Sequence, residues 1–158
     1  MKARFLLGVC LSGVVAFLGT ASTSHAQQGQ YVTQAAARLS KLIDAGNNAG
    51  YSLQNNSFSL GGGWLKKSES WVAIYSVNLV KGTKYRFLAS GDNDAKDVDL
   101  RVMDPEGNQV AIDDKVDLNA IVNYTAKTSG KHMVQIRLYD SNENLPAVCL
   151  SAMMIMKK

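Results

Sequence analysis

The chain contains few of the residues that characterise disulfide-rich small folds, histidine metal centres and proline-rich linkers. Its 158 residues include only two cysteines, two histidines and two prolines. Two cysteines exclude a small fold held by several disulfides, and two histidines leave little scope for a histidine-based metal centre. So few prolines exclude a proline-rich linker protein. Hydrophobic residues make up 46 % of the chain and charged residues 19 %, so the chain can bury a core and is not disordered.

The first 26 residues have the three parts of a secretory signal peptide. Lys2 and Arg4 form a short basic start, an uncharged apolar run covers 5–19, and Ser24-His25-Ala26 places small residues before a cut at Gln27. The alternative is a retained membrane anchor, but the apolar run is short for a span of about 20 residues. We therefore expect a secreted or periplasmic protein with no transmembrane span after cleavage.

Cleavage changes the charge of the chain and its inventory of reactive side chains. The mature chain of 132 residues keeps 15 basic and 13 acidic residues, a formal charge of +2. This balance argues against nucleic acid as a partner. One cysteine remains, Cys149, so an intramolecular disulfide is excluded. Cys149 lies in an apolar run, which predicts a buried and inert thiol.

One helix followed by strands is predicted for the mature chain. Apolar residues recur every three or four positions over 30–45, and Gly46 is expected to end this amphipathic helix. After Gly50 the period falls to two, and short turn segments separate the runs. The alternating runs lie at 71–79, 85–89, 98–102, 110–112, 120–126 and 132–138, with a continuous apolar run at 147–156.

This pattern predicts a mainly β fold, an antiparallel β-sandwich preceded by one short N-terminal amphipathic helix. No helical pattern interrupts 51–158, so a parallel sheet with crossover helices is not expected. The predicted organisation is a signal peptide at 1–26, an N-terminal helical segment at 27–50 and a sandwich domain at 51–158.

A series of short motifs follows in order along the predicted sandwich. The motifs are Tyr85-x-Phe87, Gly91-Asp92, Asp97-Val98-Asp99-Leu100-x-Val102, Asp104-Pro105-x-Gly107, Asp113-Asp114, Ala120-x-Val122-x-Tyr124 and Ser129-Gly130-x-His132-x-Val134-x-Ile136. In order and spacing they resemble the bacterial pre-peptidase C-terminal (PPC) domain family. The resemblance implies a jelly-roll-like sandwich that occurs in exported proteins. It also implies a non-catalytic domain, for which substrate attachment, secretion and maturation are the proposed roles. His132 departs from the family pattern, which commonly has an aromatic residue there.

Acidic residues are concentrated in the middle of the chain, where nine of thirteen fall within 92–117. Ca²⁺ takes six to eight oxygen ligands, and carboxylates in neighbouring loops can supply them. The alternative is that the aspartates accept hydrogen bonds from turn backbones and keep sheet edges soluble. The sequence leaves both interpretations open. The residues of the candidate calcium site are Asp92, Asp94, Asp97, Asp99, Asp113 and Asp114, of which Asp97 and Asp99 are expected on one side of a strand.

Aromatic residues near the start of the sandwich suggest a ligand surface. Trp64, beside the glycines at 61–63, is the residue we expect as an exposed platform for a protein or polysaccharide surface. The glycines are expected to form a flexible hinge or a sharp strand start. The other aromatic residues of this region, Trp71, Tyr75 and Tyr85, are expected in the core.

An enzyme is not predicted, and no catalytic residue is proposed. His132, the one histidine of the mature chain, alternates with apolar residues and is expected to face inward, so a serine hydrolase lacks an accessible base. Paired carboxylates for a glycosidase are present in number but lie in turn-like contexts.

The leading functional hypothesis is an exported, non-catalytic binding or accessory module that recognises a protein or polysaccharide surface, with calcium as the one cofactor considered. The alternative is a structural cell-envelope protein that forms a homo-oligomer through its helix or its last strand. A small hydrolase ranks third. The apolar run at 148–156 separates the first two, because it is either central in one sandwich or an interface.

Overall fold

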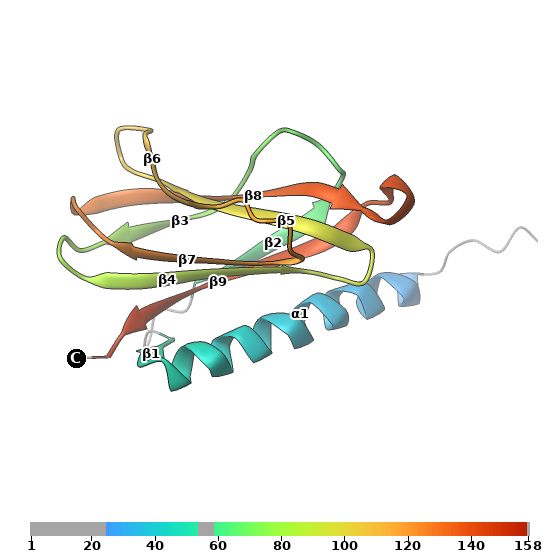
Figure 1. Cartoon of the computed structure of the whole chain (residues 1–158), viewed down its shortest axis with the longest axis horizontal. Helices are drawn as coiled ribbons and strands as arrows, with labels where there is room; N and C mark the ends of the chain where they lie inside the picture. The colour runs from blue at the N-terminus through green and yellow to red at the C-terminus, as the bar shows by residue number, and fades with distance from the viewer. Residues whose placement is uncertain (1–24, 54–58, 158) are drawn as a thin grey trace, which may run out of the picture.

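The computed structural model describes residues 25–53 and 59–157, with side chains from residue 28 onward. A long helix, α1 (His25–Asn48), precedes the strands (Figure 1). The described strands are β1 (Tyr51–Ser52), β2 (Leu60–Leu65), β3 (Val72–Leu79), β4 (Lys84–Gly91), β5 (Ala95–Met103), β6 (Gln109–Asp113), β7 (Asn119–Thr125), β8 (Gly130–Ser141) and β9 (Ala147–Met156), with a 3-10 turn, η1 (Asn142–Asn144), before the last.

The strands form two antiparallel sheets that lie face to face (Figure 1). Sheet A has the order β1–β9–β4–β7, and β2 also pairs with β9. Sheet B has the order β3–β8–β5–β6. From β2 to β9 the chain passes between the sheets in the eight-stranded order of a jelly roll. The predicted mainly β fold, a jelly-roll-like antiparallel sandwich after one N-terminal helix, is confirmed.

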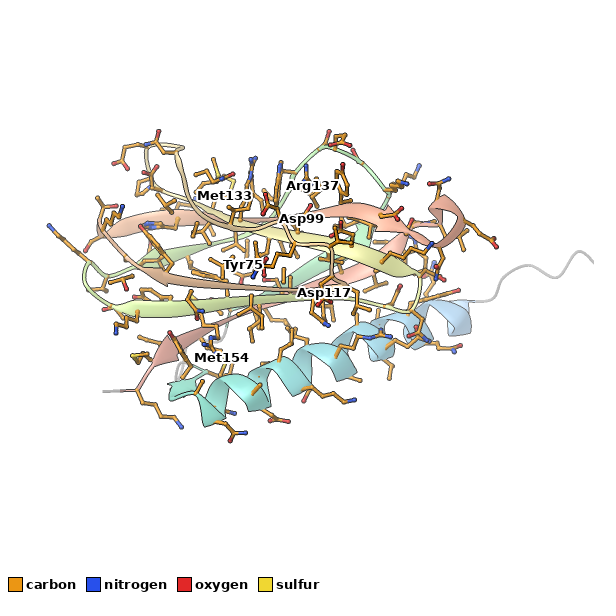
Figure 2. The ribbon with its side chains drawn as sticks, viewed as in Figure 1. Tyr75, Asp99, Asp117, Met133, Arg137 and Met154 are labelled. Atoms are coloured by element: carbon orange, nitrogen blue, oxygen red, sulfur yellow. The ribbon has the colours of Figure 1, made fainter. Side chains whose placement is uncertain are left out.

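The core lies between the two sheets because alternate side chains of each strand point inward. On β8, Val134, Ile136 and Leu138 are at most 1 % exposed, whereas the residues between them lie on the outer face. Phe87 of β4 is fully buried opposite them. Tyr75 lies in this interior, between the sheets (Figure 2).

Helix α1 covers the outer face of sheet A (Figure 1). Leu39 of the helix packs with Leu88 of β4 and with Ala152 and Met154 of β9, forming a second apolar cluster. Met154 lies between the sheet and the helix in Figure 2. A helix of this length has one apolar stripe and needs such a surface to be stable.

Strand β9 is central in sheet A, between β4 on one side and β1 and β2 on the other. Sheet B covers one face of it and α1 the other, so both sets of its side chains are buried. The apolar run predicted at 147–156 therefore has the bounds of β9 and is accommodated inside one chain.

The end of α1 was predicted wrongly. Gly46 lies inside the helix, which continues to Asn48 before Gly50, at φ +86°, turns the chain toward β1. Gly46 is buried against the Met154 thioether, and a Cβ at this position would overlap that sulfur. The glycine therefore serves close packing of the helix on the sheet rather than helix termination.

The glycines at 61–63 do not form a hinge, because they lie within β2 and pair with β9. A Cβ on Gly62 would overlap the Cys149 carbonyl oxygen of the neighbouring strand, and a Cβ on Gly61 would overlap Ile74 and Tyr75. Small residues are needed where β2 passes this close to its neighbours.

The N-terminal predictions fall largely outside the described part of the chain. Of the predicted signal peptide, only His25 and Ala26 are described, and they begin α1. Within the described residues, no helix is both long and apolar enough to cross a membrane.

Candidate functional site

Asp92, the first residue of the candidate calcium site, binds backbone groups. It is fully buried, and its two oxygens accept hydrogen bonds from the N–H groups of Asp94 (2.9 Å) and Val148 (2.7 Å). The carboxylate thus joins the short turn between β4 and β5 to the start of β9. This is the backbone role that the sequence left open as the alternative to calcium.

Asp97 and Asp99 of β5 are 3 % and 1 % exposed. Burial raises the pKa of Asp97, and the charge of Asp99 raises it further. Burial also raises the pKa of Asp99, which the hydrogen bond from Arg137 opposes. Arg137 Nε donates to Asp99 Oδ2 at 2.7 Å, whereas Asp97 Oδ1 has no hydrogen-bond partner among the described residues.

The remaining candidate ligands do not complete a cation site in the described residues. Asp113 Oδ2 accepts the backbone N–H of Ile121 at 2.8 Å, and the charges of Asp114 and Asp113 act on Asp99 from the end of β6. Asp94 offers its carbonyl oxygen to Asn142. The described part of the chain holds no group of three or more histidine, cysteine or acidic side chains that could hold a metal ion. Calcium binding stays one of the two interpretations that the sequence left open.

Trp64, the predicted platform, is 44 % exposed on β2. Its ring meets Tyr31 of α1 edge to face, with 5.2 Å between centroids and an interplanar angle of 80°. The indole is therefore exposed as expected, and it lies where the helix meets the edge of sheet A.

A second tryptophan, Trp71, lies on the outer face of sheet B with two arginines. The guanidinium carbon of Arg101 is 4.3 Å from the centroid of the Trp71 ring, and that of Arg137 is 4.7 Å away. Arg137 also lies 4.7 Å from the ring centroid of Tyr139. We call these four residues, together with Gln135, the tryptophan–arginine cluster.

The strand register explains why these residues meet. Antiparallel pairing places Arg101 of β5 opposite Gln135 of β8, and Asp99 opposite Arg137. Trp71 precedes β3, which lies along the other side of β8. All of them project away from the core, and Figure 2 shows Arg137 and Asp99 on the side of the sandwich opposite α1.

Hydrogen bonds and charges fix the cluster. Arg137 pairs with Asp99 and, at 3.6 Å, with the exposed Glu69. Arg101 Nε donates to Gln135 Oε1 at 2.7 Å, and its Nη1 lies 3.5 Å from Gln109 Oε1. Burial lowers the pKa of Arg101, and the neighbouring charge of Arg137 lowers it further.

A shallow groove of about 510 Å³ adjoins the cluster. It lies between the segment that leads from β2 to β3 and the end of β8. Its walls include Lys66, Lys67, Glu69, Tyr139 and Pro146. On its rim Lys67 Nζ donates to Asp140 Oδ1 at 2.8 Å. The cluster is therefore continuous with a depression that could receive a ligand longer than one residue.

The expectation that Trp71 belongs to the core is wrong, and a β-bulge is the reason. By simple alternation Trp71 shares a face with Val77 and Leu79, which are buried. The register of β3 against β8 shifts between Ala73 and Tyr75. A bulge exchanges the two faces of a strand, so residues before it point the opposite way from those after it. No signal in the sequence marks this position.

His132 and Cys149 lie where the sequence predicted them. His132 is fully buried on β8, with its Nδ1 3.0 Å from the Gly130 carbonyl oxygen and its ring 5.8 Å from Tyr124. Cys149 is fully buried, and burial raises the pKa of its thiol to about 12. Its thiol is therefore protonated at neutral pH and inert.

Comparison with known proteins adds no relative. No protein-family model matches the chain, and no curated protein matches it. The resemblance to the PPC domain family stays a prediction.

Proposed function

We propose that this chain is an exported, non-catalytic binding protein that recognises a polysaccharide with the outer face of sheet B. The observation that carries the proposal is the tryptophan–arginine cluster. It places a partly exposed indole on a sheet surface among planar polar side chains, those of Arg101, Gln135 and Gln109. Sugar rings have an apolar C–H face that packs on aromatic rings, and hydroxyl groups that bond to amides, carboxylates and guanidinium groups.

The rigidity of the cluster supports a binding role. Asp99 is 1 % exposed and holds Arg137, while Gln135 holds Arg101, so both guanidinium groups are fixed beside Trp71. Side chains that are already ordered lose little entropy when a ligand binds. The backbone beneath them belongs to the two central strands of sheet B, β5 and β8.

The choice of a polysaccharide over a protein rests on the chemistry of this face. Two guanidinium groups and an amide surround the indole at the centre of this face, and the half-exposed Met133 and Ile112 lie beside Gln135 and Arg101. Protein interfaces usually have a dry apolar centre, whereas the centre of this face holds two guanidinium groups. Export agrees with the N-terminal sequence pattern, and a non-catalytic role agrees with the PPC resemblance.

Affinity electrophoresis tests the proposal. The purified protein is run through native gels that contain a panel of soluble polysaccharides, acidic and neutral, and is sedimented with insoluble ones. We expect retardation by at least one polysaccharide, and we expect Trp71→Ala to abolish it. Removal of an aromatic side chain on which a ligand ring stacks costs about 1–3 kcal/mol, about 5- to 150-fold in affinity.

Trp64→Ala is the matched control, because it removes a half-exposed indole from the other sheet. Both variants are first compared with the parent protein by thermal unfolding. Loss of retardation with Trp64→Ala but not with Trp71→Ala would move the binding surface to the edge of sheet A. The proposal fails if the folded parent protein binds no polysaccharide of the panel.

A further inference from the structure

The two arginines of the cluster differ in how their charges are compensated. Arg137 has two acidic partners, Asp99 at 2.7 Å and Glu69 at 3.6 Å. Arg101 makes no salt bridge with any described residue, and its hydrogen-bond partners are the neutral amides of Gln135 and Gln109. The cluster therefore contains one guanidinium charge that the fold leaves without a counter-charge.

The surroundings of Arg101 make an anion favourable there. Its side chain is partly buried beside Trp71 and close to the like charge of Arg137. Partial burial removes water that would otherwise solvate the charge, so an incoming anion replaces solvation that has already been lost. The guanidinium remains charged at any physiological pH.

The geometry of the free donors favours a carboxylate. Nε of Arg101 is engaged by Gln135, and Nη1 has only a long contact with Gln109. Nη2 makes no hydrogen bond to the described residues, so its donors are available. A carboxylate accepts two parallel N–H groups from a guanidinium group, and this bidentate pair is stronger than neutral hydrogen bonds.

We propose that Arg101 binds the carboxylate of an acidic sugar whose ring packs on Trp71, so that the ligand is a polysaccharide built from uronic acid residues. This inference rests on the proposed function and names its substrate class.

Charge complementarity also limits how acidic the ligand can be. Glu69, Asp113 and Asp114 lie near the cluster and would repel a densely charged chain such as a polyphosphate or a polysulfated glycan. A uronic acid polymer carries one carboxylate on each sugar ring, fewer charges than a polysulfated glycan, so these acidic residues repel it less. A uronic acid polymer therefore fits this face better than a more highly charged polyanion.

The test compares one sugar chain with and without its charges. Tetragalacturonic acid and its fully methyl-esterified form are titrated into the purified protein by isothermal calorimetry. The two probes share the same ring atoms, but only the first offers carboxylates. We expect the acid to bind about tenfold or more tightly than the ester, since a charge-assisted hydrogen bond is worth about 1.5–3 kcal/mol.

Variants assign that difference to Arg101. Arg101→Gln should remove the preference for the acid, and Arg101→Lys should restore only part of it, because lysine keeps the charge but not the planar fork. Arg86→Gln is the matched control. Arg86 also stacks on an aromatic ring, Tyr51 at 4.2 Å, and bonds an amide, Asn123 at 2.8 Å, but it lies on sheet A.

The outcomes separate this inference from the proposed function. Equal binding of acid and ester, a preference that survives Arg101→Gln, or equal losses with Arg101→Gln and Arg86→Gln would overturn it. The inference would also be overturned if poly-glutamate bound as tightly as the sugar acid, because the site would then recognise negative charge and not the sugar ring. Trp71-dependent binding of a neutral polysaccharide would overturn this inference and leave the proposed function intact.

Discussion

Burial and the charge of Asp99 raise the pKa of Asp97, and the charge of Arg137 opposes them only in part. Asp97 is 3 % exposed, its Oδ1 has no partner among the described residues, and the charges of Asp99 and Asp140 both raise its pKa. A carboxyl group whose pKa is raised on folding is more stable protonated. Its contribution to stability is fully present below the unfolded pKa, near 3.8, and is lost as pH rises through the folded pKa.

Asp97→Asn should therefore stabilise the protein at neutral pH. The amide keeps an oxygen acceptor and removes the buried charge, so we expect the thermal midpoint at pH 7 to rise by a few degrees, with no gain below pH 4. Thermal unfolding across this pH range measures the effect. Asp104→Asn is the control of opposite sign, because desolvation is outweighed by hydrogen bonds from Asn108 that lower the pKa of Asp104, and this stability is lost as pH falls. A lower midpoint for Asp97→Asn at pH 7 would contradict the assignment.

The burial of single residues could be predicted where the sequence around them is enough to show which way the side chain points. His132 alternates with apolar residues and Cys149 lies in a continuous apolar run, and both are buried as expected. The roles of the aspartates could not be predicted, because they depend on partners far away in sequence. Asp92 binds the backbone of Val148, 56 residues on, and Asp99 binds Arg137 through strand pairing.

At the scale of elements, β2 depends on glycine where it crosses close to β9. A Cβ at position 62 would overlap the Cys149 carbonyl oxygen, whereas a Cβ at position 63 meets only Leu65 at 3.6 Å, an ordinary contact. We expect Gly62→Ala to cost about 1–3 kcal/mol by forcing the two strands apart. Gly63→Ala should change stability by less, since its added methyl group has room.

Urea unfolding of the two glycine variants measures the difference. The substitutions are chemically identical and lie at adjacent positions of one strand, so the change in backbone entropy is the same for both. Equal midpoints for Gly62→Ala and Gly63→Ala would show that β2 can shift away from β9 without loss.

The elements themselves followed from hydrophobic periodicity. The predicted runs match β3 to β9, and β9 has the predicted bounds. Two features escaped prediction because they depend on contacts between elements. The bulge in β3 turns Trp71 outward, and the close approach of Met154 explains Gly46 inside α1. Neither contact leaves a periodic signal in the sequence.

At the scale of the whole molecule, calcium would act by holding loops together at one end of the sandwich. The Asp92, Asp99 and Asp113 carboxylates already accept hydrogen bonds from protein donors, which calcium would have to displace. We therefore expect the thermal midpoint to be the same in millimolar CaCl₂ and in EGTA. A rise of several degrees with CaCl₂, but not with MgCl₂, would establish a calcium site and contradict this expectation.

The two layers of the sandwich could be predicted from alternation, but the assignment of strands to layers could not. Apolar residues at every second position show that a strand has one inner face, and they do not show which sheet it joins. The jelly-roll order was expected only from the PPC resemblance, whereas the register between β5 and β8, which assembles the tryptophan–arginine cluster, was not expected at all.

The position of α1 makes the two outer faces of the sandwich different. The helix lies along the outer face of sheet A, while the outer face of sheet B carries the cluster. A chain that binds a polysaccharide through one face alone coats that polysaccharide. It does not crosslink two polysaccharide strands into a network. Mixtures of this protein with its ligand should consequently stay fluid, where a two-faced lectin would produce a gel.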